Sequence, residues 1–357
     1  MFPHTIFDAN LDRLADDLRR SEVPAAIPLI ADSWLARSVL QKAIRRGMLG
    51  LALSAAAQLV VIERGALWRR LIVTALEDLG PQEFETTAAI VSAAQSPGWR
   101  SKVGGDWPVV AELVRRACAG TRSQVANDLW NIALHDPALY DAKADLCEVS
   151  PAAVCGLSMN APDFGVRAAA ALVAMNHADW CNTKAFDQRA FFDFHAEVSA
   201  VPSAILAEAY RLTRVPLAGL CLTLANAPVQ SVARADDDLA PVAWNGPIPT
   251  FAMDQYTRSG KAVIRDFAQR SAEWSAFCDC WGIERLNRNA AAGELLFRVD
   301  GAAVTSRALS PHSVELRHRS EVLGCFMPSA AVHEALSILR RQLPYIDQLR
   351  TDFKLPR

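Results

Sequence analysis

The chain has 357 residues, of which 51% are hydrophobic, 21% charged and only 8% aromatic. This composition is typical of a folded globular protein and excludes a disordered one. Its length allows two domains, or one extended helical array with an appendage. Because the formal net charge is −2, any binding to nucleic acid requires a local basic face rather than overall basicity.

Neither the ends nor the cysteines indicate export. Residues 1–20 are acidic and amphipathic, without the basic and apolar regions of a signal peptide. The most apolar window, 48–62, is interrupted by Ser54 and Gln58 and is too short to cross a bilayer. The eight cysteines form no paired framework, so reduced thiols are expected. We therefore expect a cytoplasmic protein that does not associate with membranes.

Residues 7–235 are predicted to form one helix after another. Ser33 is predicted to cap a helix that runs through Arg46, and Gly47 supplies its left-handed stop. Further helices are predicted at about 48–62, 66–79, 82–94, 107–119, 123–134, 150–159, 164–175, 184–199, 203–213 and 216–226. Short connections between successive helices predict stacked helical hairpins.

The composition changes at residue 236. Residues 236–261 contain three prolines before residue 250 and an Asn245-Gly246 turn, and they are predicted to be a linker or excursion. The elements predicted for 262–357 are a helix at 262–280, a hairpin at 294–304 turning at Asp300-Gly301, a strand at 313–317, and a closing helix at 329–349 capped by Ser329. The predicted fold is mainly α, with stacked helical hairpins over 1–235 and a smaller C-terminal α+β region.

Three segments between residues 38 and 134 carry paired arginines among apolar residues. They read SVLQKAIRRG (38–47), LWRRLIVTALEDLG (67–80) and VAELVRRACAGTRSQVANDLWNIA (110–133). Over about 38–134 the chain resembles the C-terminal helical region of the clamp-loader-like AAA+ ATPases of the Werner-interacting-protein and replication-fork-maintenance type. The resemblance implies an oligomerisation domain, with either a second copy of this chain or an AAA+ ATPase as partner, and it makes DNA a further candidate. Nothing in the chain resembles the ATPase half of that family.

Two groups of basic residues are candidates for outward contacts. Lys42, Arg45 and Arg46 end the first of these helices and could contact DNA phosphate or a partner subunit. Arg100 and Lys102 lie in the glycine-containing stretch 98–107, which is predicted to be an exposed loop. Together these five residues are the predicted binding surface.

A second group of charges is interpreted as an internal network. Glu77 and Asp78 lie in the last turn of a predicted helix, where the helix dipole disfavours carboxylates unless cations lie close. Arg69 and Arg70 are natural neutralising partners. We therefore predict that these four residues form ion pairs that fix helix packing, rather than a contact surface.

Nucleotide and metal chemistry are not indicated. Ser259-Gly260-Lys261 imitates the end of a phosphate-binding loop, but Gln255 stands where its first glycine belongs and Ala262 replaces the metal-binding hydroxyl. No cysteine or histidine spacing predicts a metal site, and no cofactor is predicted. The polar residues gathered in this region are Asp254, Tyr256, Thr257, Arg258 and Lys261. They are more typical of a capped helix start than of a pocket for chemistry.

Three hypotheses about function follow. The first is a non-catalytic adaptor in DNA replication, repair or mobile-element metabolism that oligomerises or docks to an ATPase. The second is a helical scaffold for protein interactions without a role at nucleic acid. The third is an enzyme whose site lies near 254–261. A contiguous basic face would favour the first, a long mixed groove the second, and a deep pocket at 254–261 the third.

Overall fold

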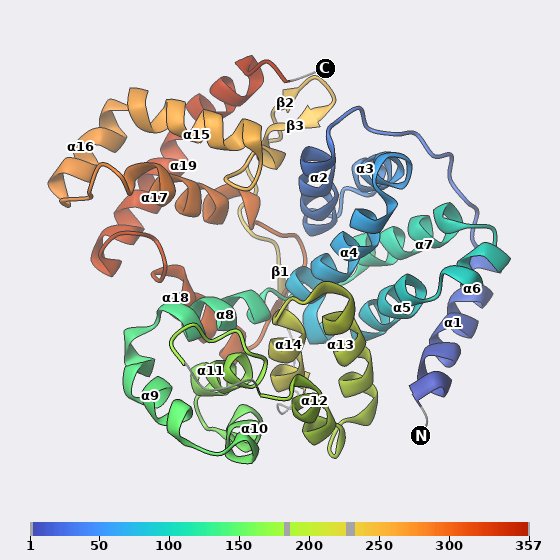
Figure 1. The fold of residues 1–357 in the computed structure, drawn as a ribbon. Coiled ribbons are helices and arrows are strands. Elements are labelled where there is room, and N and C mark those ends of the chain that lie inside the picture. The colour runs from blue at the N-terminus through green and yellow to red at the C-terminus, as the bar shows by residue number, and fades with distance from the viewer. Residues whose placement is uncertain (1–2, 182–185, 226–232, 356–357) are drawn as a thin grey trace. The chain divides into compact units, whose positions relative to one another are not determined.

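The computed structural model describes residues 3–181, 186–225 and 233–355. Helices dominate this part of the chain, and the small strands all lie after residue 232 (Figure 1). The fold is mainly α with a small C-terminal α+β region, which confirms the predicted class. No helix among the described residues is both long and apolar enough to span a bilayer.

The chain forms two compact units, and each unit is built from three separate segments. Unit 1 comprises Met1–Pro24, Trp68–Ala235 and Arg307–Ser320, and unit 2 comprises Ala25–Leu67, Asp236–Ser306 and Glu321–Arg357. The change of composition at residue 236 coincides with one boundary between the units. Residues 25–67, however, belong with the C-terminal segments, so the segment 38–134 that carries the family resemblance is divided between the units.

Unit 1 is an array of helices in which neighbours in sequence pack together. Its helices are α1 (Pro3–Arg20), α5 (Phe84–Gln95), α6 (Pro97–Lys102), α7 (Asp106–Ala119), α8 (Val125–His135), α9 (Tyr140–Glu148), α10 (Pro151–Asn160), α11 (Phe164–Ala174), α12 (Gln188–Ala196), α13 (Ala200–Thr213), α14 (Leu217–Ala225) and nearly all of α18 (Pro311–Glu321). Helix α10 packs on α11, α12 on α13, and α13 on α14, while α1 lies against α5 and α13. The predicted residues 184, 185 and 226 lie outside the described part of the chain.

Unit 2 joins two N-terminal helices to the C-terminal helices. It contains α2 (Ser33–Arg45), α3 (Leu49–Ile62), α15 (Arg258–Arg270), α16 (Ala272–Cys280), α17 (Arg288–Leu296) and α19 (Ser329–Asp352). Helix α2 packs on α3, and α15, α17 and α19 pack on one another. Helix α4 (Arg64–Thr74) begins in unit 2, and its continuation in unit 1 ends in a π-helical turn, Ala75–Leu79.

The strands form two small antiparallel pairs. In unit 1, β1 (Ala233–Ala235) pairs with β4 (Arg307–Leu309), with Arg234 opposite Ala308. In unit 2, β2 (Trp244–Asn245) pairs with β3 (Ile248–Pro249). Their two-residue loop opens with Gly246 at φ +58°, as a type II′ turn requires.

Two predicted β elements are wrong. Residues 294–304 form no hairpin, because α17 continues through this region into a π-helical turn, Phe297–Gly301. The buried pairs Ala291-Ala292 and Leu295-Leu296 recur four residues apart, which is helical spacing. Residues 313–317 form part of α18 instead of a strand. A serine followed by proline at the first helical position starts that helix: the Ser310 hydroxyl accepts the Ser313 N–H at 3.1 Å.

Predicted helix caps and boundaries also differ from the structure at several positions. Asp32 rather than Ser33 caps α2, accepting the Leu35 N–H at 2.9 Å. The helix predicted at 262–280 is two helices, because Ser271 breaks the run and caps α16. Ser329 is the first residue of α19 and not its cap. The predicted stop at Gly47 is confirmed by its φ of +65°.

Candidate functional site

The basic end of α2 points into unit 2 and not toward solvent. Lys42, Arg45 and Arg46 are all at least 92% buried. Their prediction as outward contacts to DNA or a partner is therefore wrong. Carboxylates and carbonyls from distant parts of the chain supply the partners that allow these charges to be buried.

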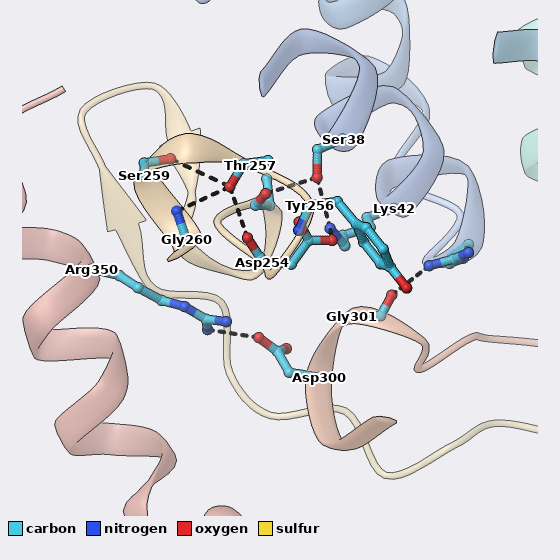
Figure 2. Close-up of polar contacts among 12 residues, drawn as sticks. Ser38, Lys42, Asp254, Tyr256, Thr257, Ser259, Gly260, Asp300, Gly301 and Arg350 are labelled. Carbon is cyan, nitrogen blue, oxygen red and sulfur yellow. Dashed lines mark hydrogen bonds and ion pairs between the residues drawn. The ribbon is translucent and has the colours of Figure 1, made fainter. Parts of the chain in front are cut away.

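Lys42 is bound on two sides. It forms an ion pair with Asp254, whose carboxylate also accepts the Tyr256 backbone N–H at 2.9 Å (Figure 2). Its ammonium group donates to the Ser38 hydroxyl at 2.7 Å, and Ser38 donates to the Ala252 carbonyl at 2.7 Å. Burial lowers the pKa of Lys42 to about 8, although the charge of Asp254 opposes that shift.

The two arginines of α2 contact the turn that follows α17. Arg45 donates to the Gly301 carbonyl at 2.7 Å. Arg46 donates to the Asp300 carbonyl at 2.9 Å and to its carboxylate at 2.6 Å. The Arg46 guanidinium also lies 3.9 Å from the centre of the Phe251 ring. The end of α2 is thereby tied to two segments more than 200 residues away.

Asp300 connects two helices through its carboxylate. One oxygen accepts from Arg46, and the other accepts from Arg350 of α19 at 2.7 Å. Arg350 also pairs with Asp347 at 2.9 Å. Burial alone would raise the pKa of Asp300, but the two guanidinium groups outweigh it and hold that pKa below its usual value. This buried cluster acts as a structural connection within unit 2.

The stretch 98–107 is not an exposed loop. Residues Pro97–Lys102 form α6, and the side chain of Arg100, within this helix, is buried. Arg100 pairs with Asp106 at 2.5 Å, and its guanidinium lies 4.4 Å from the centre of the Trp68 ring. The prediction of Arg100 as a contact residue is therefore wrong, whereas Lys102 is exposed.

The region 254–261 is a capped helix start. The Thr257 hydroxyl accepts the Gly260 N–H at 3.0 Å and donates to the Asp254 carbonyl (Figure 2). Asp254 and Thr257 are buried, while Tyr256, Arg258 and Lys261 are exposed. These five residues do not converge on a common space, because two hold the fold together and three face outward.

The four charged residues of the predicted internal network, on α4 and the turn after it, differ in how deeply they are buried. Asp78 is fully buried and accepts the Gln124 amide at 3.0 Å, while its backbone carbonyl accepts the Ser123 N–H at 2.8 Å. Arg70 and Glu77 are half-buried, and Arg69 is exposed. That the four residues form one ion-pair network stays a prediction.

A serine–histidine contact lies inside unit 1 but serves packing. The Ser158 hydroxyl is 2.9 Å from His195 Nε2, and both side chains are fully buried. The hydroxyl donates its proton to the Cys155 carbonyl at 2.7 Å. Burial lowers the pKa of His195 to about 4, so the imidazole is neutral at pH 7. A hydroxyl that already donates, away from solvent, is not poised as a nucleophile.

Unit 1 contains a groove of about 770 Å³ between α1, α12 and α13. Its apolar lining consists of Ile6, Phe7, Phe186, Phe192, Ala196, Ala200, Ala204 and Ala207. Ala200, Ala204 and Ala207 share one face of α13, so a strip of small side chains leaves the space open. At one edge the side chain of Asn176 exchanges two hydrogen bonds of 3.0 Å with the Phe186 backbone. This bonded edge gives the groove a defined wall.

Polar groups of two kinds line the same groove. The charged ones are Asp187, Arg189, Asp193, Glu208, Arg211 and Arg214. The buried ones are Ser203, whose hydroxyl has no hydrogen-bond partner among the described residues, and Tyr210. The Tyr210 hydroxyl lies 3.2 Å from His177 Nε2 and 3.4 Å from the Met175 carbonyl. A mainly apolar hollow with a few placed polar groups is typical of a ligand or peptide site.

This groove was not predicted from the sequence. Residues 184–199 and 203–213 were predicted only as helices, and the alanines were not distinguished from core positions. The available signal was the spacing of Ala200, Ala204 and Ala207, three small residues that share one face of α13 next to charged ones. That pattern marks a face where no large side chain fills the surface.

Comparison of the chain with protein-family models found no matching family, and comparisons with curated proteins and with solved structures found no matching protein.

Proposed function

We propose that this chain is a non-catalytic interaction scaffold that binds a segment of a partner protein in the groove of unit 1. The observation that carries the proposal is the groove itself, a space of about 770 Å³ with an apolar floor and a charged rim. A mixed groove is the feature expected of a scaffold, whereas the basic residues chosen for a DNA adaptor are largely internal. The eight free thiols suit the cytoplasm as its compartment.

The arrangement of the groove suits a partner segment with apolar side chains. Grooves between packed helices bind amphipathic helices through side chains that recur every three or four residues. The alanines of α12 and α13 allow such side chains to approach the helix backbones closely. The ion pairs Arg189–Asp193 and Glu208–Arg211 lie along the rim, where charges set orientation more than affinity.

Filling the groove is expected to abolish partner binding. A photo-cross-linking amino acid, p-benzoylphenylalanine, would replace Arg189 at the rim in cells of the native host. We expect one discrete adduct, which the substitution Ala204→Trp in the floor removes. Ala190→Trp is the matched control, because Ala190 is exposed on α12, the helix of Arg189, and does not line the groove.

The cross-linked peptide would be identified by mass spectrometry and synthesised, and its binding to the purified chain measured by calorimetry. Binding that survives Ala204→Trp in a protein with an unchanged melting temperature would refute the scaffold proposal. An adduct lost equally with Ala190→Trp would refute it as well.

The adaptor role in DNA metabolism, with a homo-oligomer or an AAA+ ATPase as partner, is a second proposal, and one observation favours its DNA-binding part. Arg258, Lys261 and Arg265 lie at positions i, i+3 and i+7 of α15, on one exposed face. None of the three has an ion-pair partner among the residues that the structure describes. The positive end of the helix dipole adds to their field. Such a row could contact successive phosphates of a nucleic acid.

Removing two of these charges is expected to reduce the salt dependence of DNA binding. For Lys261→Gln with Arg265→Gln, the slope of log K against log salt should fall by about 2, since each lost phosphate contact contributes about 1. Fluorescence anisotropy with an oligothymidylate and with a duplex would measure it. Arg285→Gln, an exposed cation elsewhere in unit 2, is the control. No binding by the unmodified chain at low salt, or an equal effect of the control, would contradict this proposal.

A further inference from the structure

We infer that the segment bound in the groove of unit 1 carries a carboxylate, and that Arg214 receives it while Ser203 binds a polar group at the opposite end. This inference rests on the proposed scaffold function and specifies the chemistry of its partner. Three features of the groove support it: the alignment of its polar groups, the pairing of its charges and the unsatisfied hydroxyl of Ser203.

The first feature is a line of residues along α13. Ser203, Ala207 and Tyr210 follow one another at steps of four and three residues on one stripe of α13, and Arg214, the cap residue after the helix, comes four residues later; all four line the groove. Over these 11 steps the helix rises about 16 Å. The stripe has a hydroxyl at one end and a guanidinium at the other, with apolar surface between them. An occupant that matches it is apolar along its length and polar at both ends.

The second feature is the pairing of the charged residues along the rim of the groove. The Glu208 carboxylate accepts two hydrogen bonds of 2.5 and 2.7 Å from Arg211, and Asp193 pairs with Arg189 at 3.5 Å. The third carboxylate, Asp187, caps the start of α12 by accepting the Arg189 backbone N–H at 2.9 Å. The rim carboxylates are therefore each engaged within unit 1.

Arg214 is the cation of this rim without a carboxylate. Its guanidinium lies 5.7 Å from the centre of the Tyr210 ring and hydrogen-bonds to the side chain of that tyrosine, and no acidic group is within ion-pair distance among the described residues. Arg214 ends α13 in the left-handed conformation, at φ +58°, and its N–H donates to the Tyr210 carbonyl at 2.7 Å. This hydrogen-bonded cap holds the backbone of Arg214 in place at the end of α13. Arginine is the side chain best suited to bind a carboxylate through two parallel hydrogen bonds.

The third feature is the hydroxyl of Ser203. The side chain is 98% buried, lines the groove, and forms no hydrogen bond with any described residue. The hydroxyl of a serine inside a helix commonly donates to the carbonyl four residues earlier, and such a bond would satisfy it without an occupant. The Ser203 hydroxyl does not make that bond, although the residue lines the groove. Since buried polar groups are nearly always satisfied, an occupant or its water is the natural partner.

The test uses a probe that shares this chemistry. The compound 11-(dansylamino)undecanoate combines an apolar chain with a carboxylate at one end and polar sulfonamide atoms at the other, and its methyl ester is the neutral counterpart. Both are titrated into the full chain, and dansyl fluorescence reports binding. We expect both to bind, the acid more tightly, and Ala204→Trp to abolish both.

The decisive variant is Arg214→Gln. We expect it to weaken binding of the acid roughly tenfold to a hundredfold, the range of a lost charge-assisted contact, and to leave the ester unchanged. Arg214→Lys should recover part of the loss, and Lys102→Gln, an exposed cation of unit 1 outside the groove, should have no effect. These side chains are exposed, so the variants should fold.

The outcomes separate the two proposals. If both probes bind in the groove and Arg214→Gln weakens them equally or not at all, the carboxylate inference is wrong and the scaffold proposal stands. If neither probe binds, or if Ala204→Trp leaves both affinities unchanged, this groove is not a binding site and both proposals fail.

Discussion

Replacing Asp300 by alanine is expected to lower the free energy of unfolding by about 3–5 kcal/mol, the cost of leaving buried charges without their partner. The Asp300 carboxylate holds Arg46 and Arg350, which are 92% and 99% buried. Neither guanidinium can lose its proton, so the variant must either bury positive charge or open unit 2 to water. Urea unfolding followed by circular dichroism would measure the change.

Asp347→Ala provides the matched comparison. Asp347 pairs with the same Arg350 but is partly exposed, so its removal should cost about 1 kcal/mol or less. Replacing Asp300 and Arg350 together, by alanine and methionine, should recover part of the loss because one of the two buried guanidinium groups is removed. Similar stabilities for the Asp300 and Asp347 variants would show that the buried cluster does not hold unit 2 together.

Gly260→Ala is expected to destabilise the protein by about 3 kcal/mol, although alanine is the better helix former. A Cβ atom at this position would lie 1.9 Å from the Asp254 carbonyl oxygen and 2.4 Å from its nitrogen. These are backbone atoms, so a side-chain rotation cannot relieve the overlap. The start of α15 would have to move away from the turn that presents Asp254 to Lys42. Thermal unfolding would show this as a lower melting temperature.

Gly50→Ala is the control for that substitution. Gly50 lies in the first turn of α3 in the same unit, and a Cβ there meets nothing within 4 Å. Alanine at this position should therefore be neutral, or stabilising by up to about 1 kcal/mol. Equal melting temperatures for the two variants would mean that the close approach at Gly260 is not required.

The helices could be predicted from sequence, whereas the environment of α2 could not. Apolar spacing and the positive φ at Gly47 define that helix locally. Its orientation depends on Asp254 and Asp300, which lie more than 200 residues further along the chain. In isolation, an aspartate next to a glycine indicates a turn, so Asp300 was assigned to a hairpin instead of to the partner of Arg46. Lysine and arginine are rarely buried unless paired, and the pairing is a property of the tertiary fold.

The groove could not be predicted for a related reason. Periodicity shows that Ala200, Ala204 and Ala207 share a face of α13, but small residues on a helix face more often mark close packing than open space. Open space can be told from close packing only in the tertiary fold, where α1, almost 200 residues earlier, forms part of the groove wall and does not fill the groove. Conversely, Thr257 was predicted correctly as part of a capped helix start, because a cap depends only on its immediate neighbours.

Because the segments of the two units alternate along the sequence, neither unit can complete its core early in synthesis. Unit 1 requires Arg307–Ser320, and unit 2 requires Glu321–Arg357. Strand β1 must wait for β4, which is made about 70 residues later. Unit 1 is not complete until residue 320 has been made, and unit 2 is not complete until the residues after it have followed. The end of α2, with cationic side chains destined for the interior, must remain without Asp254 and Asp300 until those residues have been made.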